Sequence, residues 1–176
     1  MLEKIIIAGF GGQGIMLLGK VLAEAAMREG RHVTFLPSYG AEVRGGTAYC
    51  MVVISDREIG SPFIGQADTL IIMNGPAQQK FKDRIKRNGL CLLNSSFVSR
   101  DVLKDIRVLK YPFTDIAVKL GNIKVANMVA LGCLAAQRKT VRLDTLSEAV
   151  KAFAPKAKQE LISINLQALR EGAKLK

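Results

Sequence analysis

The sequence predicts an α/β fold, with a three-layer, mostly parallel sheet and a helical C-terminal third. Short runs rich in isoleucine, valine and leucine alternate with segments of helical periodicity, and from Asp115 onward only the helical spacing remains. Such alternation is typical of a parallel sheet covered by helices. The sequence contains no internal repeat, low-complexity stretch or linker, so residues 1–176 are expected to form one domain.

The first 36 residues follow the order strand, glycine loop, helix, strand. Residues 4–8 form a short β-branched run, and residues 12–29 carry apolar side chains at helical spacing. Gly30 is placed to end that helix, and residues 33–36 form the second strand. We therefore expect a compact, Rossmann-like βαβ unit at the N-terminus.

Four further strands follow this unit. They are predicted at residues 47–54, 70–73, 90–94 and 108–111. Residues 58–60 are expected to return on the first of these strands as a hairpin arm. A helix is predicted to begin at Asn74-Gly75-Pro76, because proline suits the first helical turn, and to end near Gly89.

The C-terminal third is predicted to hold three helices. The first covers residues 125–137, and its small residues, Gly132 among them, permit a close helix contact. Pro155 ends the second helix, because proline cannot continue a helical hydrogen-bond ladder, and the third runs from residue 156 toward Gly172.

Composition narrows the class of protein. Apolar residues make up 49% of the chain before glycine is counted, which fits either a rich α/β core or a broad partner interface. The net charge is +11, of which residues 89–176 carry +8. A solvated basic face explains this charge most simply, and no nucleic-acid-binding signature accompanies it. No run of about 18 apolar residues and no leader sequence is found, so we expect a cytoplasmic chain without a membrane span.

The cysteines and the histidine indicate neither disulfides nor metal. Cys50, Cys91 and Cys133 are widely spaced and odd in number, which favours buried, reduced thiols in a reducing compartment. His32 is the single histidine, so no zinc site and no nucleophile–base pair can be built around it. We expect no catalytic residue and no metal ligand in this chain.

The first candidate site is the glycine loop Gly9-Phe10-Gly11-Gly12-Gln13-Gly14, which matches G-x-G-x-x-G between a strand and a helix. Its first glycine permits a tight turn, its second lets backbone N–H groups approach a phosphate, and its third allows close helix–strand packing. The helix N-terminus adds roughly half a positive charge. The loop fits an anionic group, although glycines that only permit a tight turn beneath a partner explain the pattern equally well.

A dinucleotide site requires a further group that the sequence lacks. An acidic residue normally ends the second strand and binds the ribose hydroxyls, but residues 35–38 read Phe-Leu-Pro-Ser. An NAD(P)-dependent oxidoreductase therefore remains only an alternative, as does a non-catalytic nucleotide-binding regulator.

The second candidate site follows the second strand, at residues 38–46, which read Ser-Tyr-Gly-Ala-Glu-Val-Arg-Gly-Gly. The carboxyl ends of strands in open α/β sheets are where ligands bind, so the two glycine-rich loops are expected to be neighbours. Arg44 suits a phosphate or a partner carboxylate, whereas an exposed Glu42–Arg44 ion pair would contribute little.

Together these motifs, with Ile-Ser-Asp at 54–56 and Ser-Pro at 61–62, resemble the gamma subunit of 2-oxoacid:ferredoxin oxidoreductases. The form Ser-Tyr-Gly-x-Glu-x-Arg-Gly-Gly is most similar to the 2-oxoglutarate branch. The resemblance implies that the chain works inside a complex that oxidatively decarboxylates a 2-oxoacid to an acyl-coenzyme A.

The resemblance also implies the partners. Alpha and beta subunits would bind thiamine diphosphate and magnesium, and a ferredoxin-like delta subunit would carry 4Fe-4S clusters that pass electrons to ferredoxin or another acceptor. This chain has no thiamine–magnesium signature and no four-cysteine spacing, so it is expected to bind none of these groups and to be inactive alone. Its expected roles are to brace the assembly and to help bind coenzyme A. The candidate residues for phosphate, coenzyme A or subunit contact are Gly9, Gly11, Gly12, Gln13, Gly14, Ser38, Tyr39, Glu42, Arg44, Gly45 and Gly46.

Overall fold

The computed structural model describes residues 1–38, 47–98, 105–153 and 159–175. Six strands are present in these residues: β1 (Leu2–Phe10), β2 (His32–Ser38), β3 (Thr47–Ser55), β4 (Ala67–Ile72), β5 (Ile85–Asn94) and β6 (Arg107–Tyr111). The helices are α1 (Ile15–Arg28), α2 (Gly75–Phe81), α3 (Phe113–Lys119), the 3-10 turn η1 (Ile123–Val125), α4 (Ala126–Arg138), α5 (Leu143–Phe153) and α6 (Gln159–Ala173). None of these helices is long and apolar enough to cross a membrane.

The six strands form one sheet in the order β2-β3-β1-β4-β5-β6. Strands β1, β4, β5 and β6 pair in parallel, whereas β3 runs antiparallel to both of its neighbours, β1 and β2. The predicted α/β fold with a mostly parallel sheet is confirmed. The predicted compact βαβ unit is wrong in one respect, because β3 lies between β1 and β2 and separates the two strands of that unit.

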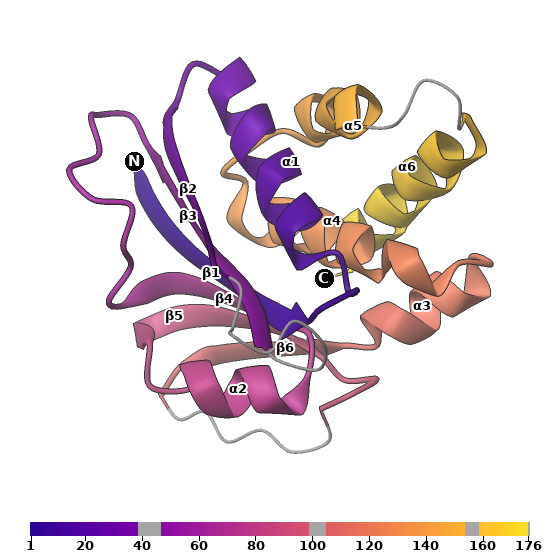
Figure 1. Cartoon of the computed structure of the whole chain (residues 1–176), viewed down its shortest axis with the longest axis horizontal. Helices are drawn as coiled ribbons and strands as arrows, with labels where there is room; N and C mark the ends of the chain where they lie inside the picture. The colour runs from indigo at the N-terminus through magenta and orange to yellow at the C-terminus, as the bar shows by residue number, and fades with distance from the viewer. Residues whose placement is uncertain (39–46, 99–104, 154–158, 176) are drawn as a thin grey trace.

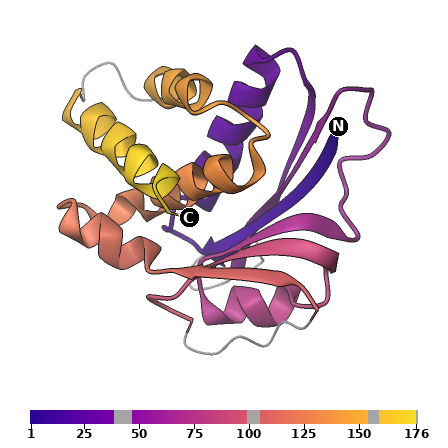
Figure 2. The same ribbon diagram turned by 180° about the vertical axis from the view of Figure 1, so that it is seen from behind.

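The sheet is the middle of three layers. Helices α1, α3, α4, α5 and α6 cover one face and α2 covers the other, as the two opposite views show (Figures 1 and 2). Successive residues of β1 point to opposite faces, so Ile5 and Ile7 join the core beneath the large helical layer while Ile6 and Ala8 join the core beneath α2. A strand that is buried on both faces must be apolar throughout, which explains the unbroken isoleucine run.

One predicted strand is absent and one predicted helix is shorter than expected. Residues 58–60 form no strand, because both edges of β3 are already paired, with β1 and with β2. The helix that starts at Asn74 ends at Phe81 rather than near Gly89, and β5 begins at Ile85, where it pairs with Ala67. The start of that helix is confirmed, since the Asn74 side chain accepts a hydrogen bond from the N–H of Ala77 at 2.9 Å.

Helices α4 and α6 pack against each other through glycine. A Cβ at Gly132 would overlap the carbonyl oxygen of Leu169, and a Cβ at Gly172 would overlap the carbonyl oxygen of Val129. The predicted close contact at Gly132 is therefore confirmed. It places α4 across the sheet, with its first turn beside the glycine loop and its last turn at the opposite edge.

Candidate anion-binding site at the glycine loop

The glycine loop connects the end of β1 to the start of α1. Gly12 has φ +97° and Gly14 has φ +71°, in the left-handed region that favours glycine, and this is why the helix begins at Ile15 rather than at Gly12. Gly11 and Gly12 are exposed, with no atom within 4 Å of where a Cβ would be. Their backbone N–H groups have no acceptor among the described residues. Two donors beside the positive end of a 14-residue helix are thus available to an anion.

The other glycines of the loop are tightly packed. A Cβ at Gly9 would lie 2.6 Å from Gln13 Oε1 and 2.9 Å from Met73 Cβ, so this position has no room for a side chain. A Cβ at Gly14 would overlap the amide of Asn127, whose Nδ2 donates to the Gly14 carbonyl at 3.1 Å. The third glycine of the motif therefore leaves room for the Asn127 side chain, which comes from α4.

Close helix–strand packing, which the motif predicts for Gly14, occurs five residues later at Gly19. A Cβ there would lie 2.5 Å from Cys50 Sγ and 2.8 Å from Phe35. Asn127 has the packing role expected of a buried asparagine near a helix start, with 2% of its surface exposed.

The Gln13 side chain folds back beneath its own loop. Its Oε1 accepts from the N–H of Phe10 at 2.7 Å and from Nδ2 of Asn74 at 3.2 Å, and its Nε2 donates to the carbonyl of Met73 at 3.4 Å. The amide thus ties the loop to the residues that follow β4. In this geometry Gln13 supports the loop from within.

A chain of buried amides continues along the carboxyl edge of the sheet. Asn94, at the end of β5, is fully buried, and its Nδ2 donates to the carbonyl of Met73 at 3.3 Å and to the hydroxyl of Thr114 at 2.9 Å. Asn74, Asn94 and Thr114 were not predicted as site residues. The signal was present, because Asn74 and Asn94 each follow a buried strand at its carboxyl end, where polar side chains gather.

A hollow of ≈380 Å³ lies beside the loop, within the range of roughly 300–1,000 Å³ that is typical of small-molecule sites. It is lined by Phe10, Gly11, Gly12, Gln13, Phe97, Thr114, Ile123, Lys124 and Ala126. Phe97 and Ile123 are each more than half exposed, and the Lys124 ammonium has no ion-pair partner among the described residues. The hollow thus combines two backbone donors, one cation and an apolar rim, which suits a ligand that carries both phosphate and apolar groups.

The second predicted loop lies mostly outside the described residues. Tyr39, Glu42, Arg44, Gly45 and Gly46 all belong to residues 39–46. Ser38 is described and pairs with Tyr49 at the end of β2. Thr47, which follows the second motif in sequence, pairs with Phe10 of the first loop.

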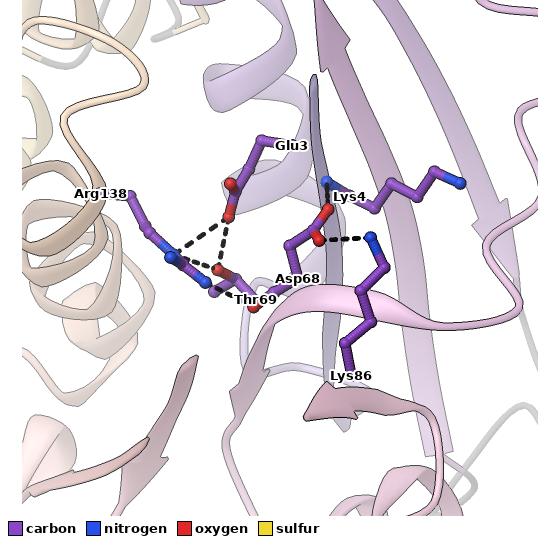
Figure 3. Close-up of polar contacts among 6 residues, drawn as sticks. All are labelled: Glu3, Lys4, Asp68, Thr69, Lys86 and Arg138. Carbon is purple, nitrogen blue, oxygen red and sulfur yellow. Dashed lines mark hydrogen bonds and ion pairs between the residues drawn. The ribbon is translucent and has the colours of Figure 1, made fainter. Parts of the chain in front are cut away.

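A second polar cluster lies at the opposite, amino edge of the sheet (Figure 3). Glu3 Oε1 accepts from the hydroxyl of Thr69 at 2.6 Å and lies 3.1 Å from Nε of Arg138. Asp68 accepts from Nζ of Lys86 at 2.5 Å and from the N–H of Lys4 at 2.8 Å. Burial raises the pKa of Glu3, and its hydrogen bond with Thr69 and the charge of Arg138 oppose that rise. Each carboxylate of the cluster thus has a cationic partner, and only Glu3 is buried, which is typical of a structural contact.

The three thiols are placed as core residues. Cys50, Cys91 and Cys133 are buried and form no disulfide, in keeping with the buried thiols that the sequence predicted, and burial raises the pKa of Cys50 and of Cys133 to about 12. Thiols with such values are protonated and unreactive at neutral pH. Among the described residues, no group of three or more His, Cys, Asp or Glu side chains is placed to hold a metal ion.

Comparison with known sequences identifies relatives along the whole chain. The 2-oxoglutarate synthase subunit KorC of Methanocaldococcus jannaschii is 36% identical over 98% of this chain and 92% of its own length. The ketoisovalerate oxidoreductase subunit VorA of Methanothermobacter thermautotrophicus is 39% identical over 97% of this chain, but this match spans only 35% of VorA. The chain thus spans about a third of VorA and nearly all of KorC.

Solved structures share the fold. The gamma subunit of a keto/oxoacid ferredoxin oxidoreductase from Geobacter sulfurreducens superimposes with a TM-score of 0.85 at 30% identity, over 98% of this chain and 96% of that one. The 2-oxoglutarate:ferredoxin oxidoreductase of Magnetococcus marinus, solved with 2-oxoglutarate, coenzyme A and succinyl-CoA bound, gives a TM-score of 0.89 at 27% identity over 31% of that chain. The model of the pyruvate ferredoxin/flavodoxin oxidoreductase family matches residues 4–175, and the chain belongs to that family.

Proposed function

We propose that this chain is the gamma subunit of a 2-oxoacid:ferredoxin oxidoreductase, with 2-oxoglutarate as the 2-oxoacid. The complex would oxidatively decarboxylate its substrate and transfer the acyl group to coenzyme A. Near-complete coverage of the KorC subunit supports the 2-oxoglutarate branch and a separate gamma chain. The chain would act as one domain within a cytoplasmic assembly of alpha, beta and ferredoxin-like delta subunits, with ferredoxin or another protein accepting the electrons.

The redox cofactors would belong to the other subunits. An iron–sulfur cluster requires several convergent thiolates, whereas the three cysteines here are buried and far apart in sequence. Magnesium bound with thiamine diphosphate requires clustered oxygen ligands, and the described residues offer no cluster of acidic groups. The described residues therefore do not fit either group, and we assign this chain no step of the electron transfer.

The contribution of this chain would be to bind coenzyme A. The observation that carries this proposal is the glycine loop, where the N–H groups of Gly11 and Gly12 have no acceptor in the described part of the chain and border a hollow that Lys124 also lines. A phosphate of coenzyme A would accept from these N–H groups, and the ammonium and the helix dipole would balance its charge. Ser38, Tyr39, Glu42, Arg44, Gly45 and Gly46 would complete the site or contact a partner subunit.

A dinucleotide is a less well supported ligand for the glycine-loop site than coenzyme A. The end of β2, where a ribose-binding carboxylate would be needed, carries Ser38 and is separated from β1 by β3.

Exchange of Gly11 for alanine tests the proposal. A Cβ at Gly11 meets no atom of the chain, so Gly11→Ala should leave the free energy of unfolding within about 0.5 kcal/mol of the original value. The same methyl group would obstruct close approach of a phosphate, so we expect the dissociation constant for coenzyme A to rise about tenfold or more. Isothermal titration calorimetry on the purified complex measures this constant.

Gly65→Ala is the matched control, because Gly65 is also exposed with open space at its Cβ position and lies on the loop before β4. Equal coenzyme A affinity in Gly11→Ala, Gly65→Ala and the unaltered complex would rule out the glycine loop as the phosphate site.

A further inference from the structure

The buried amide chain joins both walls of the hollow to one acceptor. Gln13 Nε2 and Asn94 Nδ2 both donate to the carbonyl of Met73, at 3.4 Å and 3.3 Å. Gln13 belongs to the glycine-loop wall, and Asn94 extends the contact to Thr114 on the opposite wall, at 2.9 Å. Hydrogen-bonded amides therefore link Gln13 and Thr114, which both line the hollow, through one shared carbonyl.

Gln13 contacts the first half of the glycine loop, whereas Asn127 contacts its end at Gly14. Gly11 and Gly12 contribute only backbone, and the N–H at the start of the loop, on Phe10, is held by Gln13 Oε1 at 2.7 Å. Asn74 holds the same Oε1 at 3.2 Å and is itself 1% exposed. The Gln13 side chain thus anchors the residue that directly precedes Gly11 and Gly12.

Asn94 supports the other wall in the same way. Its backbone carbonyl accepts from the N–H groups of Phe97 and Val98, at 3.2 Å and 3.1 Å, which fixes the turn that carries Phe97 to the rim. Its Oδ1 accepts from the N–H of Thr114 at 3.4 Å. Asn94 has no exposed surface, so no ligand can contact it directly.

We propose that Gln13 and Asn94 are positioning residues that set the affinity of the hollow for coenzyme A without forming its main contacts. The inference rests on the proposed function, because coenzyme A is the ligand whose binding these residues would control. Binding is tightest when the N–H groups of the loop are already oriented. If they must be ordered on binding, the free-energy cost of that ordering weakens the affinity.

The test uses the purified complex with Gln13→Met, which keeps the length of the side chain and removes its three hydrogen bonds. We expect the dissociation constant for coenzyme A, measured by calorimetry without 2-oxoacid, to rise about tenfold. The Michaelis constant for coenzyme A should rise in parallel, while kcat at saturating coenzyme A stays within about twofold. Asn94→Asp keeps the shape of the side chain and replaces its donating NH₂ by an oxygen, so it should act in the same direction.

Gln66→Met is the matched control, because Gln66 is exposed and donates to the carbonyl of Asp83 at the far edge of the sheet. Gln13→Glu keeps the acceptor for Phe10 but puts a carboxylate beside the Met73 carbonyl and the proposed phosphate, so the rise should be at least as large as in Gln13→Met. It also supplies the decisive measurement if the Gln13→Met complex does not assemble.

The inference is overturned if the dissociation constant for coenzyme A is unchanged in both Gln13→Met and Asn94→Asp. Where Gln13→Met does not assemble, an unchanged dissociation constant in Gln13→Glu overturns it. A fall in kcat with no change in the dissociation constant overturns it as well. If Gly11→Ala still weakens coenzyme A binding, only the positioning role fails. If Gly11→Ala has no effect either, the proposed function of the loop fails with it.

Discussion

The two edges of the sheet both gather buried polar side chains, but they use them differently. At the carboxyl edge the groups are neutral: the partly buried side chain of Gln13 and the buried side chains of Asn74, Asn94 and Thr114. They leave two backbone donors and a hollow beside them. At the amino edge the cluster around Glu3 contains opposite charges that satisfy one another (Figure 3). A polar cluster that closes on itself stabilises the fold, whereas one that leaves donors without acceptors is available to a ligand.

Helix α4 connects the two edges. Its first turn places Asn127 against Gly14 at the carboxyl edge, and its last turn places Arg138 against Glu3 at the amino edge. A substitution in this helix can therefore disturb both edges of the sheet or only one of them.

The largest effect is expected from Gly132→Ala, which should disturb both edges. The added methyl group would overlap the backbone of α6 at Leu169, so the two helices must separate. We expect a loss of about 3 kcal/mol in the free energy of unfolding, with weaker coenzyme A binding as α4 moves. Urea denaturation measures the first and calorimetry the second. Helix propensity alone predicts that this exchange raises the free energy of unfolding by about 1 kcal/mol. Such a gain would contradict the role of Gly132 in the close contact between α4 and α6.

A smaller effect, confined to the amino edge, is expected from Arg138→Met. The exchange keeps the aliphatic stem and leaves Glu3 without its cation, so we expect the free energy of unfolding to fall by about 2–3 kcal/mol. Loss of a fully buried pair would cost more, but the Arg138 side chain is 27% exposed. Coenzyme A affinity should not change. Arg170→Met is the control, because Arg170 is exposed on α6 and should show less than about 0.5 kcal/mol. An equal loss of unfolding free energy in Arg138→Met and Arg170→Met would show that the Glu3–Arg138 ion pair stabilises the fold no more than an exposed arginine does.

The smallest effect is expected from the protonation of Glu3. Because burial raises its pKa above 4.5, the folded chain binds this proton more tightly than the unfolded chain does. The resulting stabilisation is complete below about pH 4.5 and is lost as the pH rises through the raised pKa.

Glu3→Gln, which cannot ionise, should therefore become more stable relative to the unaltered chain as the pH rises. Unfolding free energies measured for both chains between about pH 4 and pH 7 check this difference. Other carboxyl groups are common to the two chains and largely cancel. A difference that does not vary with pH would show that Glu3 ionises normally in the folded state.

The candidate site was predictable where it depends on local backbone. Gly12 and Gly14 need positive φ angles for a turn between a strand and a helix, and that need is visible in the sequence as a glycine motif. Asn94 and Thr114 were missed because they are 80 and 100 residues from Gly14, and only strand order brings them to the loop.

The sequence by itself determined the alternation of strands and helices, the glycine turn at residues 9–14 and the burial of the cysteines, because each depends on local conformational preference or on hydrophobicity. Only the tertiary structure decided that β3 lies between β1 and β2, that Gly14 makes room for Asn127, and that Gln13 supports its own loop. These features depend on which strands become neighbours. Pairing between distant segments is selected by the packing of the whole core, which no local pattern records.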